Sequence, residues 1–489
     1  MWRDGGVESA GLRMQVRTNG RLIPGDLQRQ RLYYPADARD GRPRTGRTAA
    51  NHRIQCTAAP GGSRTLDIVF TLEETAPAAS AVLRQARARL RRWENDGRFR
   101  DPAARQLAAA GAAFIARRES TGGKTILAGY PFFEDWGRDT MIALPGCALA
   151  TGRYEDAKSI LETFLRCEQD GLMPNLFPEG KNAPMYNTVD AALLFIHCVR
   201  LYERYTGDFD FVRRAWPVMR RIAAAYQNGT RHGIHMDTDG LIAAGQGLDQ
   251  VTWMDVRIGD ILPTPRHGKP VEINAYWYNA LRILEELAPR MGESGAEYAC
   301  LAETVRRSFR EKFWMEDKGY LRDVISGTDQ DEQIRCNQIW AVSMPFTMLD
   351  PEQERRVVAT VERELYTPVG LRTLSPGDPA FHPLYGGPQK QRDLAYHQGT
   401  VWPFPLGAFY LAWLKVHGYS AGAKRRVRDR LLALGPALRE GCVGQLPEIY
   451  DGENPTASRG CFAQAWSVGE LLRVYEALER PVPPVFDHK

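Results

Sequence analysis

Apolar residues recur at helical spacing along most of this 489-residue chain, from near Ala78 onward. Residues three and four positions apart share one face of an α-helix, so this pattern predicts helices. Clear examples are the segments AALLFIHCVRLYERYTG (191–207), WPFPLGAFYLAWLKVHG (402–418) and AQAWSVGELLRVYEALE (463–479). About a dozen such segments alternate with irregular loops. The chain is therefore predicted to be mainly α-helical.

The loops between these helices are rich in Gly, Pro, Asp and aromatic residues. This alternation of helices and loops favours a fold in which paired helices form a ring and the loops at one end line a central pit. A helical solenoid and a large bundle are the alternatives. A solenoid would repeat its sequence at a fixed period, and no such repeat is visible.

The first 76 residues differ from the rest of the chain. They contain short β-prone pieces, MQVRTN, HRIQC and LDIVFTL, separated by stretches rich in Gly, Pro and Arg. This pattern predicts a few strands and loops. Because single cores stop growing near about 250–300 residues, a chain of this length is expected to divide. We predict a short β-rich accessory region at 1–76, a shortened sandwich remnant, and a large helical domain at 77–489.

Composition excludes several classes of protein. The net charge of +5 comes without an isolated run of Lys or Arg, so nucleic-acid binding is not expected. The sequence has no stretch of about 18 apolar residues, so no membrane span is predicted. The cysteines form no C-x-x-C pair and no zinc-type spacing with His, which favours reduced thiols in a cytoplasmic protein. No P-loop, G-x-S-x-G or H-E-x-x-H motif is present. We expect no cofactor and no metal.

Several loops combine aromatic side chains with carboxylates, amides and arginine. A pyranose ring has apolar faces that aromatic rings cover and a rim of hydroxyls that planar polar groups bind. Taken singly, an aromatic residue at a helix start is more often part of the core or a cap. Together the loops favour a carbohydrate pocket; they lie at residues 134–139, 173–177, 186–190, 250–255, 397–403, 445–450 and 464–466.

Hydrolysis of a glycosidic bond requires two carboxyl groups, one acid and one base or nucleophile. Asp255 and Glu448 are candidates because each stands next to apolar residues, which raise a carboxyl pKa. A salt bridge or a helix cap would also account for either residue. Other acids compete with them at this stage: Asp139, Asp190, Asp260, Glu272 and Asp451.

Long motifs resemble one known family. The C-terminal amylo-α-1,6-glucosidase domain of glycogen debranching enzymes, prokaryotic type, is similar to this chain in the runs GYPFFEDWGRDTMIALPG, DGLMPNLFPEG, MYNTVDAALLF, QVTWMDVRIGD, TPRHGKPVEINAYWYNAL, YHQGTVWPFPLG, QLPEIYDG and RGCFAQAWSVGELLR. The similarity covers roughly residues 80–480. It implies an (α/α)6 barrel, a toroid of six helical hairpins. It also implies inverting hydrolysis of the α-1,6-linked glucosyl stub on a trimmed glycogen branch.

The resemblance assigns roles residue by residue. Asp255 in the TWMD motif would be the general acid and Glu448 in LPEI the general base. Trp136, Arg138 and Asp139 would hold the terminal glucose in the deepest subsite. The same pocket would be lined by Asn175, Asp190, Trp253, Glu272, His397, Gln398, Trp402 and Trp466.

The expected partner is glycogen or a branched α-glucan oligosaccharide. Because no second glycosidase domain precedes the helical region, we expect a separate enzyme to trim the branch. Related inverting glucosidases acting on α-1,4 or α,α-1,1 glucosides remain an alternative. A non-catalytic glycan-binding protein is a second alternative, although it would need neither candidate carboxylate. An (α/α) terpenoid-type lyase would need Asp-rich metal-binding segments on helices, and none is visible.

Overall fold

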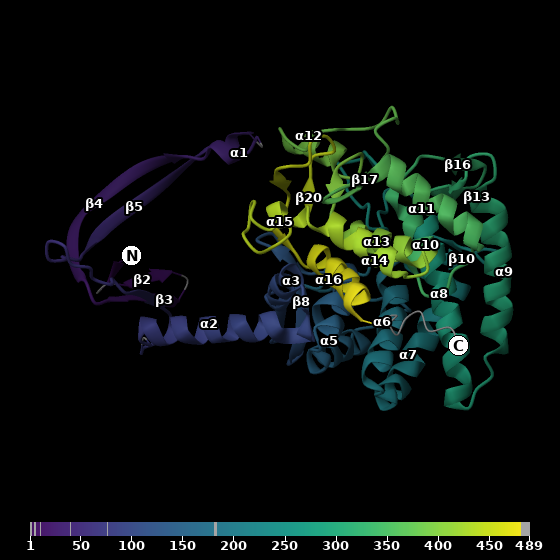
Figure 1. Cartoon of the computed structure of the whole chain (residues 1–489), viewed down its shortest axis with the longest axis horizontal. Helices are drawn as coiled ribbons and strands as arrows, with labels where there is room; N and C mark the ends of the chain where they lie inside the picture. The colour runs from purple at the N-terminus through teal and green to yellow at the C-terminus, as the bar shows by residue number, and fades with distance from the viewer. Residues whose placement is uncertain are drawn as a thin grey trace. The chain divides into compact units, whose positions relative to one another are not determined.

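The computed structural model describes residues 2–3, 6–9, 11–39, 41–75, 77–179 and 183–480. It is mainly helical, which confirms the prediction from apolar spacing. The chain divides into two compact units, Met1–Trp93 with Gly386–Gln389 and Glu94–Tyr385 with Lys390–Lys489. Helix α2, Ala79–Asn95, lies mostly in the first unit (Figure 1). The boundary at residue 76 stays a prediction.

The first unit contains two antiparallel sheets. Strands β1 (Trp2–Arg3), β2 (Gly6–Ser9), β3 (Leu12–Thr18) and β6 (Ile68–Thr71) pair in the order β1-β2-β3-β6. The long strands β4 (Arg21–Tyr33) and β5 (Thr45–Gln55) pair with each other, and the short helix α1 (Pro35–Arg39) joins them. The three β-prone pieces of the sequence thus fall in β3, β5 and β6. None of the described residues of this unit is buried.

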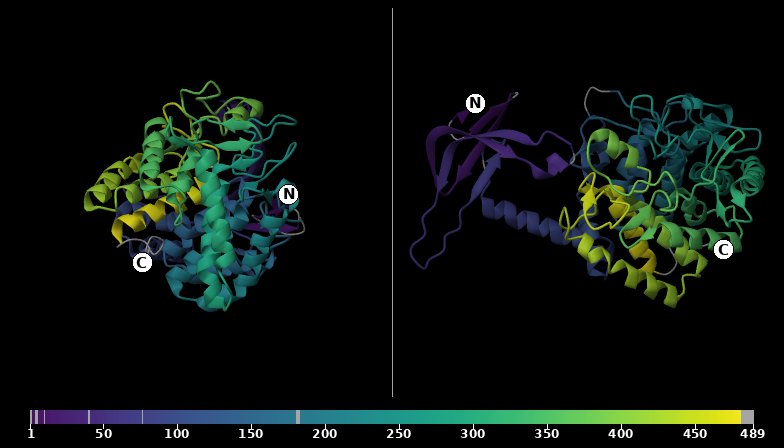
Figure 2. Two further views of the ribbon diagram at one scale, coloured as in Figure 1. Left: turned by 90° about the vertical axis from the view of Figure 1, so that its right-hand side faces the viewer. Right: turned by 90° about the horizontal axis from the view of Figure 1, so that it is seen from above.

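The second unit contains the remaining helices, drawn from blue to yellow in Figures 1 and 2. The α-helices are α3 (Pro102–Ala112), α4 (Gly137–Leu144), α5 (Tyr154–Arg166), α6 (Ala191–Thr206), α7 (Phe209–Asn228), α8 (Val271–Leu287), α9 (Ala296–Phe313), α10 (Trp340–Ser343), α11 (Pro351–Leu365), α12 (Gln389–Ala395), α13 (Phe404–Val416), α14 (Ala421–Leu431), α15 (Leu434–Ala437) and α16 (Ala465–Glu479). Short 3₁₀ turns are η1 (Asp96–Arg98), η3 (Arg231–Gly233), η4 (Ala288–Met291) and η5 (Cys336–Ile339), and a π-turn, η2 (Pro145–Ala150), extends α4.

These helices are of two kinds. Helix α13 is buried on all sides, from Phe404 to Leu414, as expected of a helix that is apolar all round. Helix α11 buries one face, including Val357, Val361 and Leu365, and exposes the other. Its start is fixed by a capping box, in which the Asp350 carboxylate accepts from the Gln353 backbone N–H at 2.9 Å. Fully buried and amphipathic helices alternate along the chain, which indicates an inner and an outer layer.

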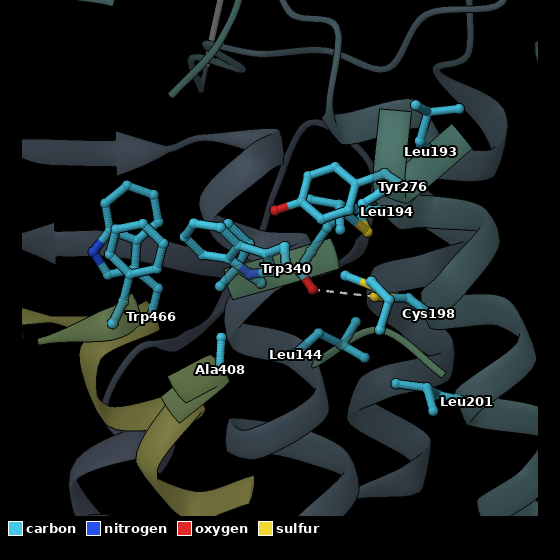
Figure 3. Packing of buried hydrophobic residues seen from close by; sticks show 14 of the residues in the cluster. Leu144, Leu193, Leu194, Cys198, Leu201, Tyr276, Trp340, Ala408 and Trp466 are labelled. Atoms are coloured by element: carbon cyan, nitrogen blue, oxygen red, sulfur yellow. Dashed lines mark hydrogen bonds between the residues drawn. The ribbon is translucent and has the colours of Figure 1, made fainter. Parts of the chain in front are cut away.

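The buried helices contact one another in succession. Helix α4 contacts α6, α6 contacts α8, α8 contacts α10, α10 contacts α13, α13 contacts α16, and α16 contacts α4. Their side chains meet in one apolar core (Figure 3), where Leu144, Cys198, Tyr276, Trp340 and Trp466 each come from a different helix. The Cys198 thiol donates to the Met141 carbonyl oxygen at 3.1 Å, so a predicted reduced thiol is part of this core.

Short strands lie between the helices of the second unit along the chain. One sheet has the order β22-β8-β7, with β9 also paired to β8, and a second has the order β17-β18-β19-β20-β21. Their bounds are β7 Ile115–Arg118, β8 Gly123–Tyr130, β9 Phe133–Asp135, β17 Tyr366–Thr367, β18 Gly370–Arg372, β19 Val401–Trp402, β20 Ile449–Tyr450, β21 Ser458–Arg459 and β22 Ala463–Gln464. The remaining pairs use β10 His235–Met236, β11 Ile242–Ala243, β12 Lys269–Pro270, β13 Trp314–Met315, β14 Tyr320–Leu321, β15 Val324–Ser326 and β16 Asp329–Asp331.

None of the helices that the structure describes combines the length and the apolar character needed to cross a membrane.

Candidate active site

A cavity of about 110 Å³ lies at the N-terminal ends of the buried helices α4, α13 and α16. Trp136 is the N-cap of α4, Gln464 is the N-cap of α16, and Trp402 ends β19 two residues before α13. On a scale where one water needs roughly 10–15 Å³, the cavity has room for about seven to eleven water-sized atoms, close to the size of one monosaccharide. Its lining consists of Phe133, Trp136, Arg138, Asp139, Trp253, Asp255, Tyr396, His397, Trp402, Glu448, Gln464 and Trp466.

Arg138 anchors one side of the cavity. Its guanidinium donates to Asp190 at 2.6 Å, to Asp255 at 3.0 Å and to the Thr188 hydroxyl at 3.1 Å. A further N–H donates to the Val251 carbonyl oxygen at 3.2 Å. Because every arm of the guanidinium is engaged, Arg138 holds the two carboxylates in fixed positions relative to each other.

Asp255 faces the cavity, and 31% of its side chain is exposed. Burial raises the pKa of Asp255, Arg138 acts in the opposite direction, and the carboxylate of Asp190 raises it further. The Asp255 carboxyl is therefore easier to protonate than a surface aspartate, while it remains paired with a cation.

Glu448 faces the same cavity and is almost fully buried. The Tyr396 hydroxyl donates to its Oε1, and the Cys461 backbone N–H donates to its Oε2 at 2.9 Å. Burial raises the pKa of Glu448 to about 7, although both hydrogen bonds lower it; the nearby charge of Asp255 raises it again. Two donors aimed at the carboxylate stabilise its ionised form.

Asp139 adds a third carboxyl group to the cavity wall. Burial raises its pKa well above the usual value, Arg138 opposes this, and the carboxylates of Asp255, Glu448 and Asp190 raise it further. The Gln464 side-chain amide donates to Asp139 at 3.3 Å. Since Arg138 is the one cation in the described lining, these acids cannot all be ionised together at low cost.

Aromatic rings form another part of the cavity wall. The Trp253 ring lies 5.1 Å from Trp402 and 5.3 Å from His397, both edge to face, and Trp402 lies 5.9 Å from Trp466. Trp466 in turn stacks on Phe404 at 4.2 Å. Such packing fixes the ring faces that line the cavity, and rigid apolar faces suit the C–H faces of a sugar.

Some polar atoms of the lining residues have no hydrogen-bond partner in the protein. They are both ring nitrogens of His397, the Gln464 Oε1 and the Trp466 Nε1. Burial lowers the pKa of His397 well below its ordinary value, and the cations Arg335, Arg138 and Arg266 lower it further, so the ring is neutral and offers one donor and one acceptor. Unpaired buried polar groups are uncommon, and four of those found among the described residues lie at this cavity. Together with the carboxyl pair, they suit a ligand that carries many hydroxyls.

The sequence profile of the amylo-alpha-1,6-glucosidase family matches residues 109–473, about three quarters of the chain. The chain belongs to this family. Its membership confirms the resemblance seen in the sequence motifs and places the chain among the glycoside hydrolases.

Two curated relatives share the region of the family. The glycogen debranching enzyme of Saccharomyces cerevisiae is 26% identical over 461 residues, which cover 72% of this chain and 30% of the yeast protein. The probable alkaline/neutral invertase A of Arabidopsis thaliana is 21% identical over 431 residues, which cover 76% of this chain and 63% of that protein. The chain thus spans less than two thirds of the length of either relative.

One solved structure is similar in fold. It is the GH63 mannosylglycerate hydrolase from Thermus thermophilus, crystallised in complex with glucose. The superposition has a TM-score of 0.53 at 17% identity and covers 74% of this chain and 97% of the other.

Most of the residues that the family resemblance assigned line the cavity. Asn175, Asp190, Glu272 and Gln398 do not. Asp190 binds Arg138 from behind, and Asn175 accepts the Gly137 N–H with its backbone oxygen at 2.7 Å. Glu272 pairs with Arg266, and Gln398 accepts from Arg335 at 2.6 Å. These four residues support the wall and its charges from outside the cavity.

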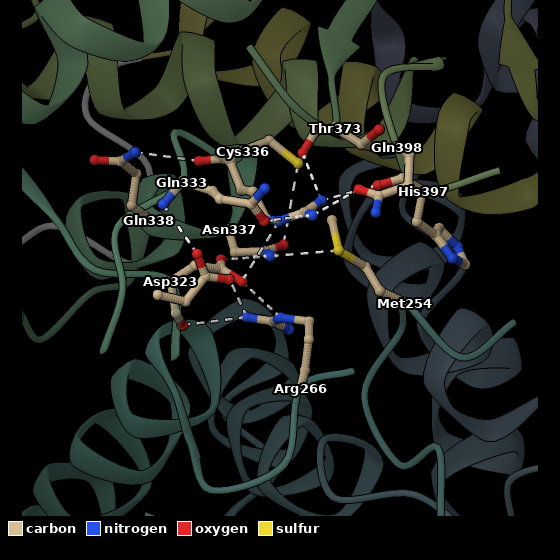
Figure 4. A network of polar contacts seen from close by, with 12 residues as sticks. Met254, Arg266, Asp323, Gln333, Cys336, Asn337, Gln338, Thr373, His397 and Gln398 are labelled. Atoms are coloured by element: carbon tan, nitrogen blue, oxygen red, sulfur yellow. Dashed lines mark hydrogen bonds and ion pairs between the residues drawn. The ribbon is translucent and has the colours of Figure 1, made fainter. Parts of the chain in front are cut away.

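His397 and Gln398 are adjacent in the sequence, but their side chains lie in different surroundings. Figure 4 shows the Gln398 side chain inside a buried polar network and the His397 ring outside it. The competing acids Asp260 and Asp451 lie outside the cavity lining. Asp260 is exposed, and Asp451 pairs with Arg459 at 2.9 Å.

Phe133, Tyr396 and Gln464 line the cavity without having been assigned from the sequence. Phe133 and Tyr396 lie inside the motifs GYPFFEDWGRD and YHQGTVWPFP, and Gln464 is two residues before Trp466. The only indication in the sequence was that each of these residues lies in or next to a motif with residues assigned to the pocket. Over the part of the chain that the structure describes, no cluster of three or more His, Cys, Asp or Glu residues could hold a metal ion.

Proposed function

We propose that this chain releases glucose from α-1,6-linked branch stubs of glycogen or limit dextrin by an inverting two-carboxylate mechanism. The observation that carries the proposal is that Asp255 and Glu448, from loops 193 positions apart, share one cavity of monosaccharide size. Membership of the amylo-alpha-1,6-glucosidase family supports the linkage, and so does the similarity to the yeast glycogen debranching enzyme. The glucose bound to the Thermus neighbour is in line with a glucose-sized site.

The architecture that we propose for residues 77–489 is an (α/α)6 barrel, with residues 1–76 as an accessory region. The closed succession of contacts from α4 through α6, α8, α10, α13 and α16 back to α4 supports six inner helices. The amphipathic helices α5, α7, α9, α11 and α14 would form the outer layer, together with α3.

In the proposed mechanism, Asp255 protonates the leaving oxygen and Glu448 activates a water on the opposite face of the sugar. The raised pKa of Asp255 favours the protonated form that an acid needs. The Tyr396 hydroxyl and the Cys461 N–H favour the ionised form of Glu448 that a base needs. Arg138 then stabilises Asp255 as its proton leaves, because the guanidinium binds the carboxylate more tightly than the acid.

The decisive experiment measures glucose release from a limit dextrin trimmed by phosphorylase and transferase, beside maltose and trehalose, with the anomer followed by NMR. Release of β-glucose from the α-1,6 stub alone is the expected result. Activity only on maltose or trehalose would move the substrate to an α-1,4 or α,α-1,1 glucoside. A folded protein that releases glucose from none of them would be a glycan-binding protein instead.

A substrate whose leaving group needs no protonation distinguishes the roles of the two carboxyl groups. With α-glucosyl fluoride, Asp255→Asn should keep most of its activity, while Glu448→Gln should lose it. On the O-glycoside both variants should lose about 10²–10⁴-fold in turnover, the usual contribution of a general acid or base. The reverse pattern on the fluoride would exchange the two roles.

A further inference from the structure

Asp255 lies in a segment with little regular structure. Between β11 and β12 the chain forms isolated bridges, Ala244 to Gly268 and Ile258 to Ile261, and no helix or strand. A proton-transfer group has to be held within about 0.5 Å of its productive position. Side-chain contacts must therefore fix this segment, since backbone ladders do not.

Arg138 binds Asp255 itself, and Asn337 holds the two residues before it. The Asn337 Oδ1 accepts from the Trp253 indole N–H at 2.8 Å, and its Nδ2 lies 3.6 Å from the Met254 sulfur. Trp253 and Met254 are the two residues directly before Asp255. Asn337 itself is fully buried in η5 and does not line the cavity.

A charged network holds Asn337 from behind. Its Nδ2 donates to Asp323 Oδ1 at 2.8 Å, and Asp323 Oδ2 accepts from Arg266 at 2.8 Å (Figure 4). Arg266 also donates to both carboxylate oxygens of Glu272. The indole N–H requires an oxygen and the Asp323 carboxylate requires an N–H, so the orientation of the amide is determined by its partners.

We propose that Asn337 is a positioning residue that fixes Asp255 for proton transfer through Trp253 and Met254. This rests on the proposed function, in which Asp255 is the acid. Only an amide of this length provides the acceptor and the donor together. Leucine at this position would leave the Trp253 N–H unpaired and would remove one donor from Asp323, both in a buried site.

The test compares Asn337→Leu with Asn274→Leu as a matched control. Asn274 is also fully buried and makes three hydrogen bonds, but these go to Ile242 and Pro270 at the two ends of the segment and not to the residues beside Asp255. Both variants lose a buried amide. The readout is kcat and KM on the O-glycoside that the wild type cleaves and on α-glucosyl fluoride, whose leaving group needs no acid.

For Asn337→Leu we expect kcat on the O-glycoside to fall about 10²-fold, the size of effect of a misplacement of about 1 Å, with KM nearly unchanged. On the fluoride, kcat should fall less than about tenfold, because the acid is not needed there. Asn274→Leu should change both substrates by the same factor. Asn337→Ser, whose short side chain leaves room for water beside Asp323, gives a milder second variant if the leucine variant does not fold.

Parallel losses on both substrates, or no loss on either, would overturn the positioning role while leaving the proposed function in place. A wild type inactive on every α-glucoside, the fluoride included, would overturn both.

Discussion

The hydrogen bond from the Tyr396 hydroxyl to Glu448 gives a prediction that can be worked through in numbers. Tyr396→Phe keeps the ring, which packs 5.0 Å from Trp402, and removes only the donor. A hydrogen bond to a charged group contributes about 1.5–3 kcal/mol, and one pKa unit corresponds to about 1.4 kcal/mol. The pKa of Glu448, about 7 in the wild type, should therefore rise by about one to two units.

The sign of the effect on activity follows from the proposed role of Glu448 as the base. The base must be ionised, so the acid limb of the kcat/KM profile reports its pKa in the free enzyme. In Tyr396→Phe this limb should move from near pH 7 toward about pH 8–9. At pH 6, below both pKa values, the variant should be about 10- to 100-fold less active than the wild type, and the two should converge as the pH rises.

The assay is the initial rate of glucose release across about pH 5 to 10, the range that spans both limbs. Tyr410→Phe is the matched control, because its buried hydroxyl bonds Tyr366 at 3.1 Å and does not reach the cavity. This control should leave the acid limb in place. An acid limb of Tyr396→Phe that stays with the wild type, or moves to lower pH, would refute the reasoning.

Other expected outcomes concern the two carboxyls and their surroundings. Asp255→Asn and Glu448→Gln should each lose turnover by orders of magnitude while keeping the circular dichroism of the wild type. The pKa of Glu448 is about 7 in the folded state, above its unfolded value. The folded protein therefore loses up to about 3 kcal/mol of stability as the pH rises from about 4.5 through 7. Glu448→Gln should melt at a higher temperature than the wild type at pH 8 and should lose this advantage at about pH 4.5. Gly460→Ala should lower kcat, because a Cβ at this position would collide with Glu448 Oε2 and because the φ of +64° disfavours alanine. Normal kinetics in this variant would contradict the close packing around Glu448.

The helices and several wall residues could be predicted because their signals are local. Apolar spacing within a single segment identifies a helix such as α13 or α16, and a loop that holds both Trp and Asp, such as that before α4, indicates a polar site with apolar faces. The family motifs then selected Asp255 and Glu448 among the competing acids. These predictions needed no knowledge of which loops meet.

The residues that the sequence did not reveal act over long separations. Asn337 meets Trp253 across 84 positions, and Arg335 meets Gln398 across 63. Neither Asn337 nor Arg335 belongs to any of the motifs that carry the family resemblance. The direction of a side chain is equally hidden, since Gln398 points into the network while its neighbour His397 lines the cavity.

The cavity and the network beside it differ in their charge balance. Behind Trp253, the cations Arg266 and Arg335 face the carboxylates Glu272 and Asp323, so the charges of this buried group cancel. In the cavity, Asp139, Asp255 and Glu448 face one arginine that also binds Asp190, and burial, with mutual repulsion as a smaller cause, raises their pKa values. A balanced network cannot easily move to relieve this repulsion, because each shift would break paired charges in a dry interior. In the proposed mechanism the cavity instead relieves this repulsion by binding protons, which would place a transferable proton where a two-carboxylate hydrolysis requires one.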